Sequence, residues 1–293
     1  MNLKSKVQQS HWGILIFLSV LWGCSFILIK KALIAFDPIQ LGCLRLGISS
    51  LAFAPMVWWH RRDIEWKMLP LFIAVGLSGS GLPAFLFAYA QTEVSSSLAG
   101  LLNSLTPIWT LIIGILLFRL NFSNLKLIGV VTGFVGAGML ILMGNGGISN
   151  GIQWQSLLIV AATVCYGSSV NMVQAFFGHT KPMIISSMSF FVLGIPALIW
   201  LFTTDFLQVM AHDPQAKWSL GAVTILALFG TVLASMIFYY LVQKTSAVFG
   251  STVTYLMPVV ALAWGIFDGE TITILHIAGL CLILVGVYFT KKS

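Results

Sequence analysis

The chain has 293 residues, of which 58% are hydrophobic and only 8% are charged, against roughly 25% charged in a soluble globular domain. Its 15 basic and 8 acidic side chains are too few to cover the surface of a soluble protein of this length. The composition excludes most soluble folds and leaves a polytopic membrane protein without a separate soluble domain. The basic residues behind the net charge of +7 lie near segment ends rather than in runs, which indicates membrane topology rather than nucleic-acid binding.

Ten apolar runs follow one another along the chain, and a helix needs about 20 mostly apolar residues to span a bilayer. The breaks between them are short, which is typical of antiparallel helical neighbours, and the longest polar break lies around Asp205–Lys217. The first run is too long for a signal-peptide core and has no small-residue cleavage site, so we expect it to stay in the mature protein. We predict spans over residues 11–32, 38–59, 68–90, 94–118, 125–143, 154–176, 183–203, 218–242, 246–267 and 273–290.

The basic residues are divided unequally between the two sides of this arrangement. Eleven of the 15 fall on the side of the two chain ends, three (Lys30, Lys31 and Lys217) fall on the other side, and Arg45 lies inside a span. The positive-inside rule therefore predicts that both termini are cytoplasmic.

The four cysteines, Cys24, Cys43, Cys165 and Cys281, lie inside apolar runs, and none has C-x-x-C spacing. We expect buried, inert thiols rather than disulfides or a metal site, and nothing in the sequence predicts a cofactor.

The two halves of the chain resemble each other. Leu21-Trp22-Gly23-Cys24-Ser25 aligns with Cys165-Tyr166-Gly167-Ser168-Ser169 at an offset of 144, and Pro107 aligns with Pro258 at an offset of 151. Each half holds five predicted spans, an odd number, so the second half enters the membrane from the opposite side. The prediction is an all-α membrane fold of ten transmembrane helices, arranged as two inverted five-helix repeats over residues 1–147 and 148–293. Repeats of this kind are typical of carriers that work by alternating access.

At this point the chain resembles the EamA family of ten-helix transporters, in the drug/metabolite transporter superfamily. The resemblance covers nearly the whole chain and implies a bacterial inner-membrane exporter with cytoplasmic termini and a central cavity between the halves. The motifs that carry it are Leu21-Trp22-Gly23 with Phe26, Pro38 and Arg45, Pro107, Pro258 with Asp268-Gly269-Glu270, and Gly129 and Gly136 with Gly279 and Gly286. One departure is that Arg119 stands where the family pattern usually has a second glutamate, at the position that matches Glu270.

A carrier's substrate site needs polar or aromatic groups near the middle of the bilayer that face the bundle interior. We name as cavity candidates Trp22, Ser25, Tyr89, Asn103, Trp109, Tyr166, Ser169, Asn171, Gln174, Tyr240 and Tyr255. Small and hydroxyl residues at these spacings also serve close helix packing, and the amides also serve structural hydrogen-bond networks. Pro107 and Pro258 are hinge or gate candidates, with a static kink as the alternative. For Arg45 we favour a structural role, with an anionic substrate group as the alternative.

Glu93 and Glu270 are expected to be solvated loop charges near the outer surface, and no Asp or Glu lies in mid-span. The leading functional hypothesis is therefore a carrier, sufficient as a monomer, that exports a small neutral, zwitterionic or amphipathic metabolite such as an amino acid. A drug, toxic-compound or purine efflux carrier is the alternative within this class. From other classes we consider a channel or scaffold, and an intramembrane serine protease using Ser78 in Gly76-Leu77-Ser78-Gly79 with His276, for which the sequence case is poor.

Overall fold

The computed structural model describes residues 3–118, 124–143 and 154–291, and all regular structure in these ranges is helical. The α-helices are α1 (Leu3–Ala32), α2 (Pro38–Trp59), α3 (Leu69–Gly76), α4 (Leu82–Ala90), α5 (Ser96–Leu102), α6 (Thr106–Phe118), α7 (Asn124–Met143), α8 (Ser156–Phe176), α9 (Pro182–Leu201), α10 (Phe206–His212), α11 (Ala216–Ala227), α12 (Ala234–Lys244), α13 (Ala247–Ser251), α14 (Met257–Phe267) and α15 (Ile274–Lys291).

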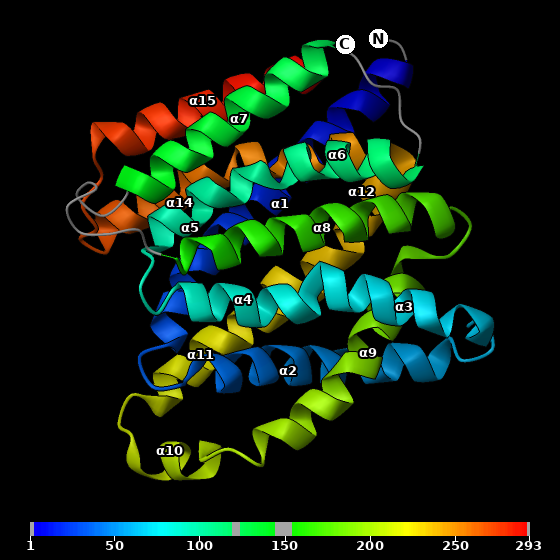
Figure 1. Cartoon of the computed structure of the whole chain (residues 1–293). Coiled ribbons are helices and arrows are strands. Elements are labelled where there is room, and N and C mark those ends of the chain that lie inside the picture. The colour runs from blue at the N-terminus through cyan, green and yellow to red at the C-terminus, as the bar shows by residue number, and fades with distance from the viewer. Residues whose placement is uncertain (1–2, 119–123, 144–153, 292–293) are drawn as a thin grey trace.

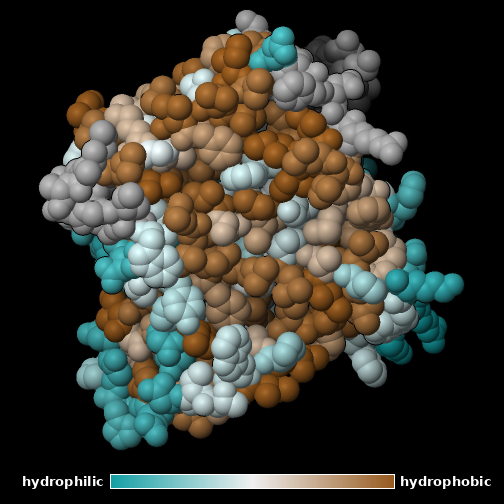
Figure 2. Space-filling view, in the orientation of Figure 1, coloured by the Kyte–Doolittle hydropathy of each residue, from teal (hydrophilic) through white to brown (hydrophobic). Residues whose placement is uncertain are grey.

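Eight helical stretches in the described part of the chain are long and apolar enough to cross a membrane, and two further apolar helices, Leu127–Leu142 and Ile274–Phe289, are shorter. Figure 1 shows most of these helices running side by side across the view, so that their ends form two opposite faces of the bundle. On the face shown in Figure 2, hydrophobic side chains fill the middle and hydrophilic ones gather where the helices end. This distribution is that of a protein that crosses a bilayer several times.

Each predicted segment is helical in the structure, but four of them are interrupted by tighter or wider turns. Two interruptions are π-helical, η2 (Leu77–Gly81) between α3 and α4 and η5 (Leu228–Leu233) between α11 and α12. Two are 3₁₀-helical, η3 (Asn103–Leu105) between α5 and α6 and η6 (Thr252–Tyr255) between α13 and α14. A π-helical turn leaves backbone groups outside the regular ladder and often marks a functional site in a helix.

The proline candidates lie next to these interruptions. Pro107 is the second residue of α6 and follows η3, and Pro258 is the second residue of α14 and follows η6. In the first turn of a helix, proline removes an N–H group that would have no partner there in any case. The prolines therefore begin the second part of each broken segment instead of bending a continuous helix.

Close helix packing depends on small residues, as expected for a membrane bundle. Where α7 packs on α15, a Cβ atom on Gly136 would lie 2.7 Å from the Gly279 carbonyl oxygen, and one on Gly286 would lie 2.5 Å from that of Gly129. The two helices contact each other through backbone at these positions, and Figure 1 shows them running together along one edge of the bundle.

The polar break around Asp205–Lys217 contains a short helix, α10. The expectation about the cysteines needs correction. Cys281 is exposed and Cys24 and Cys165 are half-buried, so only Cys43 is a buried thiol, although all four cysteines are free.

Candidate functional site

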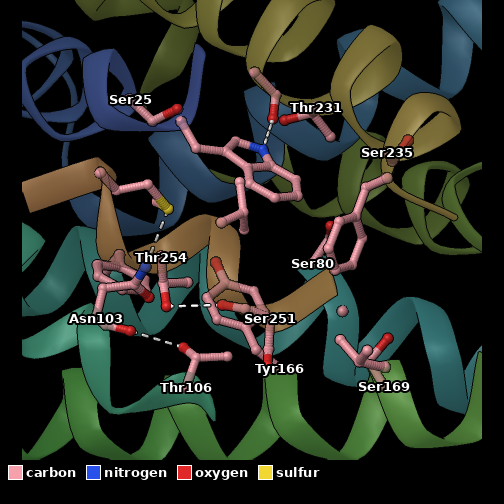
Figure 3. A pocket seen from close by; sticks show the side chains of 18 of the residues that line it. Ser25, Ser80, Asn103, Thr106, Tyr166, Ser169, Thr231, Ser235, Ser251 and Thr254 are labelled. Carbon is pink, nitrogen blue, oxygen red and sulfur yellow. Dashed lines mark hydrogen bonds between the residues drawn. The ribbon is translucent and has the colours of Figure 1, made fainter. Parts of the chain in front are cut away.

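A cavity of about 100 Å³ lies inside the bundle, several times the space that one water molecule needs. Its lining comes from both halves of the chain, from α1 and α2 to η5, α12 and η6. Figure 3 shows hydroxyl and amide groups from several helices arranged around aromatic rings. The polar residues of the lining are Ser25, Arg45, Ser80, Asn103, Thr106, Ser169, Thr231, Ser235, Ser251 and Thr254, and the aromatic ones are Trp22, Phe26, Phe87, Tyr166, Phe238 and Tyr239.

The aromatic part of the lining is held by specific contacts. The Trp22 indole N–H donates to the carbonyl oxygen of Gly230, in the π-helical turn η5, at 2.7 Å. The Trp22 ring meets Phe238 edge-on with centroids 5.0 Å apart, and Tyr166 stacks on Phe87 at 6.1 Å. An indole whose N–H is already bonded presents only its ring to the cavity, so Trp22 offers a substrate an apolar surface.

Most serine and threonine hydroxyl groups of the lining donate their protons to backbone carbonyls. Thr106 donates to the Asn103 carbonyl at 2.8 Å, Ser251 to Val248 at 2.9 Å and Thr254 to Ser251 at 2.9 Å. A hydroxyl oxygen that donates its only proton keeps its lone pairs as acceptors. The part of the cavity that Thr106, Ser251 and Thr254 line is therefore rich in hydrogen-bond acceptors.

Arg45 is the one cation among the lining residues, and its side chain is only 7% exposed. Its Nε donates to the Thr231 hydroxyl at 3.0 Å, and Thr231 donates in turn to the Leu226 carbonyl at 3.2 Å. The five-residue spacing from Thr231 to Leu226 reflects the π-helical turn, which thus positions the hydroxyl that holds the guanidinium.

The structure brings five of the eleven cavity candidates to the lining: Trp22, Ser25, Asn103, Tyr166 and Ser169. The other six lie elsewhere. Tyr89 and Tyr240 are exposed, Trp109 packs edge-on against Phe134 of α7, and Tyr255 is not among the lining residues although its neighbour Thr254 is. Aromatic residues on a membrane helix can face lipid or a neighbouring helix as readily as a cavity, so residue type alone did not separate these cases.

The two remaining candidates, Asn171 and Gln174, bond to backbone instead. The Asn171 amide donates to the carbonyls of Thr110 and Gly167 at 2.8 Å each. The Gln174 side-chain oxygen accepts from the Ala247 N–H, the first of α13, at 2.6 Å. These amides join α8 to α6 and to α13, which is the structural network left open as the alternative from sequence.

Thr106 and Phe87 line the cavity but were not among the residues singled out from sequence. Thr106 follows Asn103 by three residues, and that helical spacing was the available signal. Phe87 carries no such signal, because one phenylalanine in an apolar segment is indistinguishable from the others.

One end of the bundle carries a cluster of charges around Glu270, and the expectation that this residue is solvated was wrong. Its carboxylate is 7% exposed and accepts hydrogen bonds from the backbone N–H and hydroxyl groups of Ser96 and Ser97 over 2.5–3.0 Å. Lys30 of α1 lies 2.7 Å from both Glu270 and Asp268, and Lys31 also pairs with Asp268. The cluster therefore joins α1, the first turn of α5 and the turn after α14.

The turn after α14 explains how Glu270 reaches α5. Gly269 has a φ of +77°, its N–H bonds to the Ile266 carbonyl, and the Glu270 N–H bonds to that of Gly265. This is a Schellman ending, in which glycine takes the left-handed conformation and reverses the chain. The reversal directs the carboxylate back toward Ser96 and Ser97.

The pKa of Glu270 reflects opposing effects. Burial alone would raise it, but the Lys30 ammonium and the donors of Ser97 and Ser96 outweigh burial and lower the pKa from 4.5 to about 2. The pKa of Asp268 is lowered as well, by hydrogen bonds to Lys30 and Lys31. Both carboxylates are therefore ionised at neutral pH.

The opposite end of the bundle is held by neutral groups and one exposed ion pair. Gln174 bonds the start of α13, as described above, and the Gln243 amide donates to the carbonyls of Phe177 and Thr180 at 2.6 and 2.7 Å. Lys181 pairs with Asp63 at 2.9 Å on the surface. Arg119, which aligns with Glu270, lies outside the described residues.

The two residues of the protease hypothesis do not form a catalytic pair. Ser78 donates its hydroxyl proton to the Ala74 carbonyl at 2.6 Å, one turn earlier in the same segment. His276 lies in α15, where its Nδ1 is within 3.0 Å of the Thr273 N–H and hydroxyl. Among the described residues, no group of three or more His, Cys, Asp or Glu side chains is arranged to hold a metal ion.

The fold defines a multi-pass membrane protein with an internal cavity, and comparison with known proteins identifies its class. An uncharacterized transporter of Archaeoglobus fulgidus is 26% identical over 97% of this chain and 100% of that protein. A "probable amino-acid metabolite efflux pump" of Salmonella typhimurium is 26% identical over 92% of this chain and 90% of its own length. An uncharacterized inner membrane transporter of Escherichia coli is 25% identical over 89% of this chain and 84% of its own.

A solved crystal structure shares the fold, with a TM-score of 0.64 at 16% identity over 97% of this chain and 96% of that one. The model of the EamA-like transporter family matches residues 11–142 and 153–291. The chain belongs to the EamA-like transporter family and is a transporter rather than an enzyme, as its sequence predicted.

Proposed function

We propose that this protein is a secondary carrier that exports a small neutral, zwitterionic or amphipathic metabolite, such as an amino acid, by alternating access. The observation that carries the proposal is the central cavity, whose polar and aromatic lining comes from both halves of the chain. The membrane would be a bacterial inner membrane, as for the relative in Escherichia coli, with both termini in the cytoplasm. The first turn of α1 and the last turn of α15 lie at the same end in Figure 1, which supports termini on one side.

Ten membrane helices in two inverted repeats, residues 1–147 and 148–293, are part of the proposal. The family model matches each half in turn. The helical interruptions also recur in order: η2 corresponds to η5 and η3 to η6, each pair about 150 residues apart. A proline follows the 3₁₀ turn in both halves, and we propose that Pro107 and Pro258 mark the hinges at which the two broken segments rearrange.

The two ends of the bundle support alternating access, because corresponding positions close both. An offset of 144 residues relates Lys30 to Gln174, and an offset of 151 relates Ser96 to Ala247. At one end, Lys30 binds the Glu270 carboxylate that accepts from Ser96, and at the other, Gln174 accepts directly from Ala247. A carrier of this design would open one closure while it keeps the other.

Efflux from proteoliposomes loaded with a panel of amino acids, purines and lipophilic cations tests the proposal. We expect export of at least one zwitterionic or neutral compound, in line with the printed name of the Salmonella typhimurium relative. Export of purines or lipophilic cations alone would favour the alternative of drug, toxic-compound or purine efflux. Transport of sugar phosphates in preference to amino acids would contradict the proposal, because phosphate groups usually need several cations and the cavity has one.

Cross-linking separates a carrier from a channel. Cysteines introduced for Lys31 and Asp268, whose side chains pair across the cluster at one end, would allow a cross-linker to fix that end. A carrier should lose transport when the cross-link forms and regain it when the link is reduced. Conduction that survives the cross-link would contradict alternating access.

A further inference from the structure

Arg45 is held in the cavity with most of its hydrogen-bonding capacity unused. A guanidinium has five N–H donors, and the structure gives Arg45 one hydrogen bond, from Nε to Thr231. Within the described residues no carboxylate forms an ion pair with it, and neither Nη1 nor Nη2 donates a hydrogen bond to the protein. In the same part of the chain, no backbone carbonyl accepts a hydrogen bond from the guanidinium, although a structural role at a helix end would require one.

A buried charge without a partner is costly, because the protein interior replaces little of the hydration it loses. The cost is removed when an anion enters and the planar guanidinium forms two parallel hydrogen bonds with it. Thr231 holds Nε and so orients the plane, which leaves the two terminal nitrogens for the ligand. One guanidinium matches one carboxylate in both charge and shape.

The cavity has a second polar pole, a group of hydrogen-bond acceptors around Asn103, whereas Arg45 is a hydrogen-bond donor. The Asn103 side-chain oxygen is buried and has no hydrogen-bond partner, while its amide nitrogen is 3.6 Å from the Met257 sulfur, a weak acceptor. Figure 3 shows Asn103 near Thr106, in the lower part of the picture, whereas Thr231 lies near the top. Thr106, Ser251 and Thr254 add hydroxyl oxygens whose protons are already donated. This pole accepts hydrogen bonds and suits an ammonium group.

We propose that Arg45 binds the carboxylate of a zwitterionic substrate and that Asn103, with the neighbouring hydroxyl oxygens, binds its ammonium group. The ligand class is an α-amino acid, whose side chain lies against aromatic rings such as Trp22 and Tyr166. The inference rests on the proposed carrier function and narrows it, because neutral molecules and lipophilic cations would leave the guanidinium without its partner.

The test is a binding measurement with chemically matched probes on the purified full-length protein. Two amino acids are compared as ligands. For each of them, three compounds are titrated by calorimetry: the amino acid, the amine without the carboxylate, and the acid without the amine. The sets are L-leucine, 3-methylbutylamine and 4-methylpentanoate, and L-phenylalanine, 2-phenylethylamine and 3-phenylpropanoate. We expect the wild type to bind at least one of the two amino acids more tightly than it binds the matching amine or the matching acid.

The Arg45→Met variant removes the charge and keeps a side chain of similar width. We expect affinity for the amino acid and the acid to fall at least about thirtyfold, as for a buried charge pair that loses one member, while the amine is unaffected. Arg45→Lys should recover part of the lost affinity, because lysine restores the positive charge but not the two parallel N–H donors of the guanidinium. Asn103→Leu should weaken the amino acid and the amine but not the acid. Arg62→Met, at an exposed arginine, is the matched control and should change none of the three.

A structural role for Arg45 predicts a different pattern. Without ligand, Arg45→Met should unfold at the same temperature as the wild type or higher, because an unpaired buried charge has been removed. Equal loss of all three ligands, or a fall of more than about 5 °C in unfolding temperature, would overturn the proposal. So would a wild type that binds neither amino acid. Export of another compound that is unaffected by Arg45→Met would retain the carrier and reject this carboxylate site.

Discussion

The Glu270→Gln substitution tests whether the charged cluster keeps one end of the bundle closed. Glutamine has the same shape as glutamate but no charge, and it has one acceptor oxygen in place of two. Oε1 of Glu270 accepts from Ser96 and lies 2.7 Å from the Lys30 ammonium, and Oε2 accepts from Ser97. The variant loses the attraction to Lys30 and directs an NH₂ group toward the donors of one serine.

The size of the effect follows from the pKa. Lowering the carboxyl pKa from 4.5 to about 2 corresponds to roughly 3 kcal/mol in favour of the ionised, closed arrangement. Because Lys30 is about one-third exposed and partly screened by solvent, we expect about 2 kcal/mol of this to be lost in the variant. If the closed end is the more stable state, the open fraction should rise about thirtyfold.

The assay is the labelling rate of a single cysteine in the cavity. Ser80→Cys places the reporter in the lining, in a background without the four native cysteines. A membrane-impermeant maleimide is added from outside the cell, the side that the Glu270 end faces in the proposed orientation. Glu270→Gln should raise the labelling rate about thirtyfold or to saturation. Asp63→Asn removes one member of the exposed ion pair with Lys181 and is the matched control. The reasoning is refuted if Glu270→Gln labels at the parent rate, or if Asp63→Asn accelerates labelling as much.

The pKa of Glu270 also predicts a pH dependence. Because its folded-state pKa is lowered, its stabilisation is fully present above about pH 4.5 and is lost as the pH falls through about 2. The difference in unfolding temperature between wild type and Glu270→Gln should therefore be constant from about pH 8 to 5 and become smaller below about pH 5. A temperature difference that has already halved at about pH 6 would contradict this expectation. At the other end, Gln174→Leu removes an acceptor from the first N–H of α13 and should raise labelling of the same reporter in inside-out vesicles about fivefold, as for one lost hydrogen bond. Gln155→Leu, at a half-buried glutamine that makes no side-chain cap, is its control and should match the parent. Gly167→Ala should lower the unfolding temperature by several degrees, because the new Cβ would lie 2.8 Å from the backbone of α6, whereas Gly138→Ala has open space and should not. Equal unfolding temperatures for these two glycine variants would show that α8 and α6 are not closely packed there.

Hydropathy and spacing predicted where the helices lie, since the membrane requires apolar runs of a minimum length. They did not predict how four of the segments are interrupted, because a π-helical or 3₁₀ turn depends on which backbone groups find partners on neighbouring helices. Gly79 and Gly230 are separated by 151 residues, the same offset that relates Pro107 to Pro258, and only the structure shows that both lie in π-helical turns beside the cavity.

For the candidate site too, the sequence predicted some of the contacts and not others. Trp22 and Tyr166, matched by the internal repeat, both line the cavity. Asn171 and Gln174, named as cavity candidates as well, bond instead to the backbone of neighbouring helices. The cost of an unsatisfied amide is real in both situations. Sequence establishes that a partner must exist, but not whether it is a ligand or a carbonyl on the next helix.

The sequence by itself determined that this protein lives in a membrane, that it is helical and that it belongs to a family of transporters. These properties follow from composition, from the period of the apolar runs and from motifs along one chain. Tertiary structure alone decided which polar residues meet. Glu270 is 240 residues from Lys30, and Arg45 is 186 residues from Thr231. Such pairs depend on how helices pack, and a linear pattern of apolar and polar residues does not specify which helix faces which.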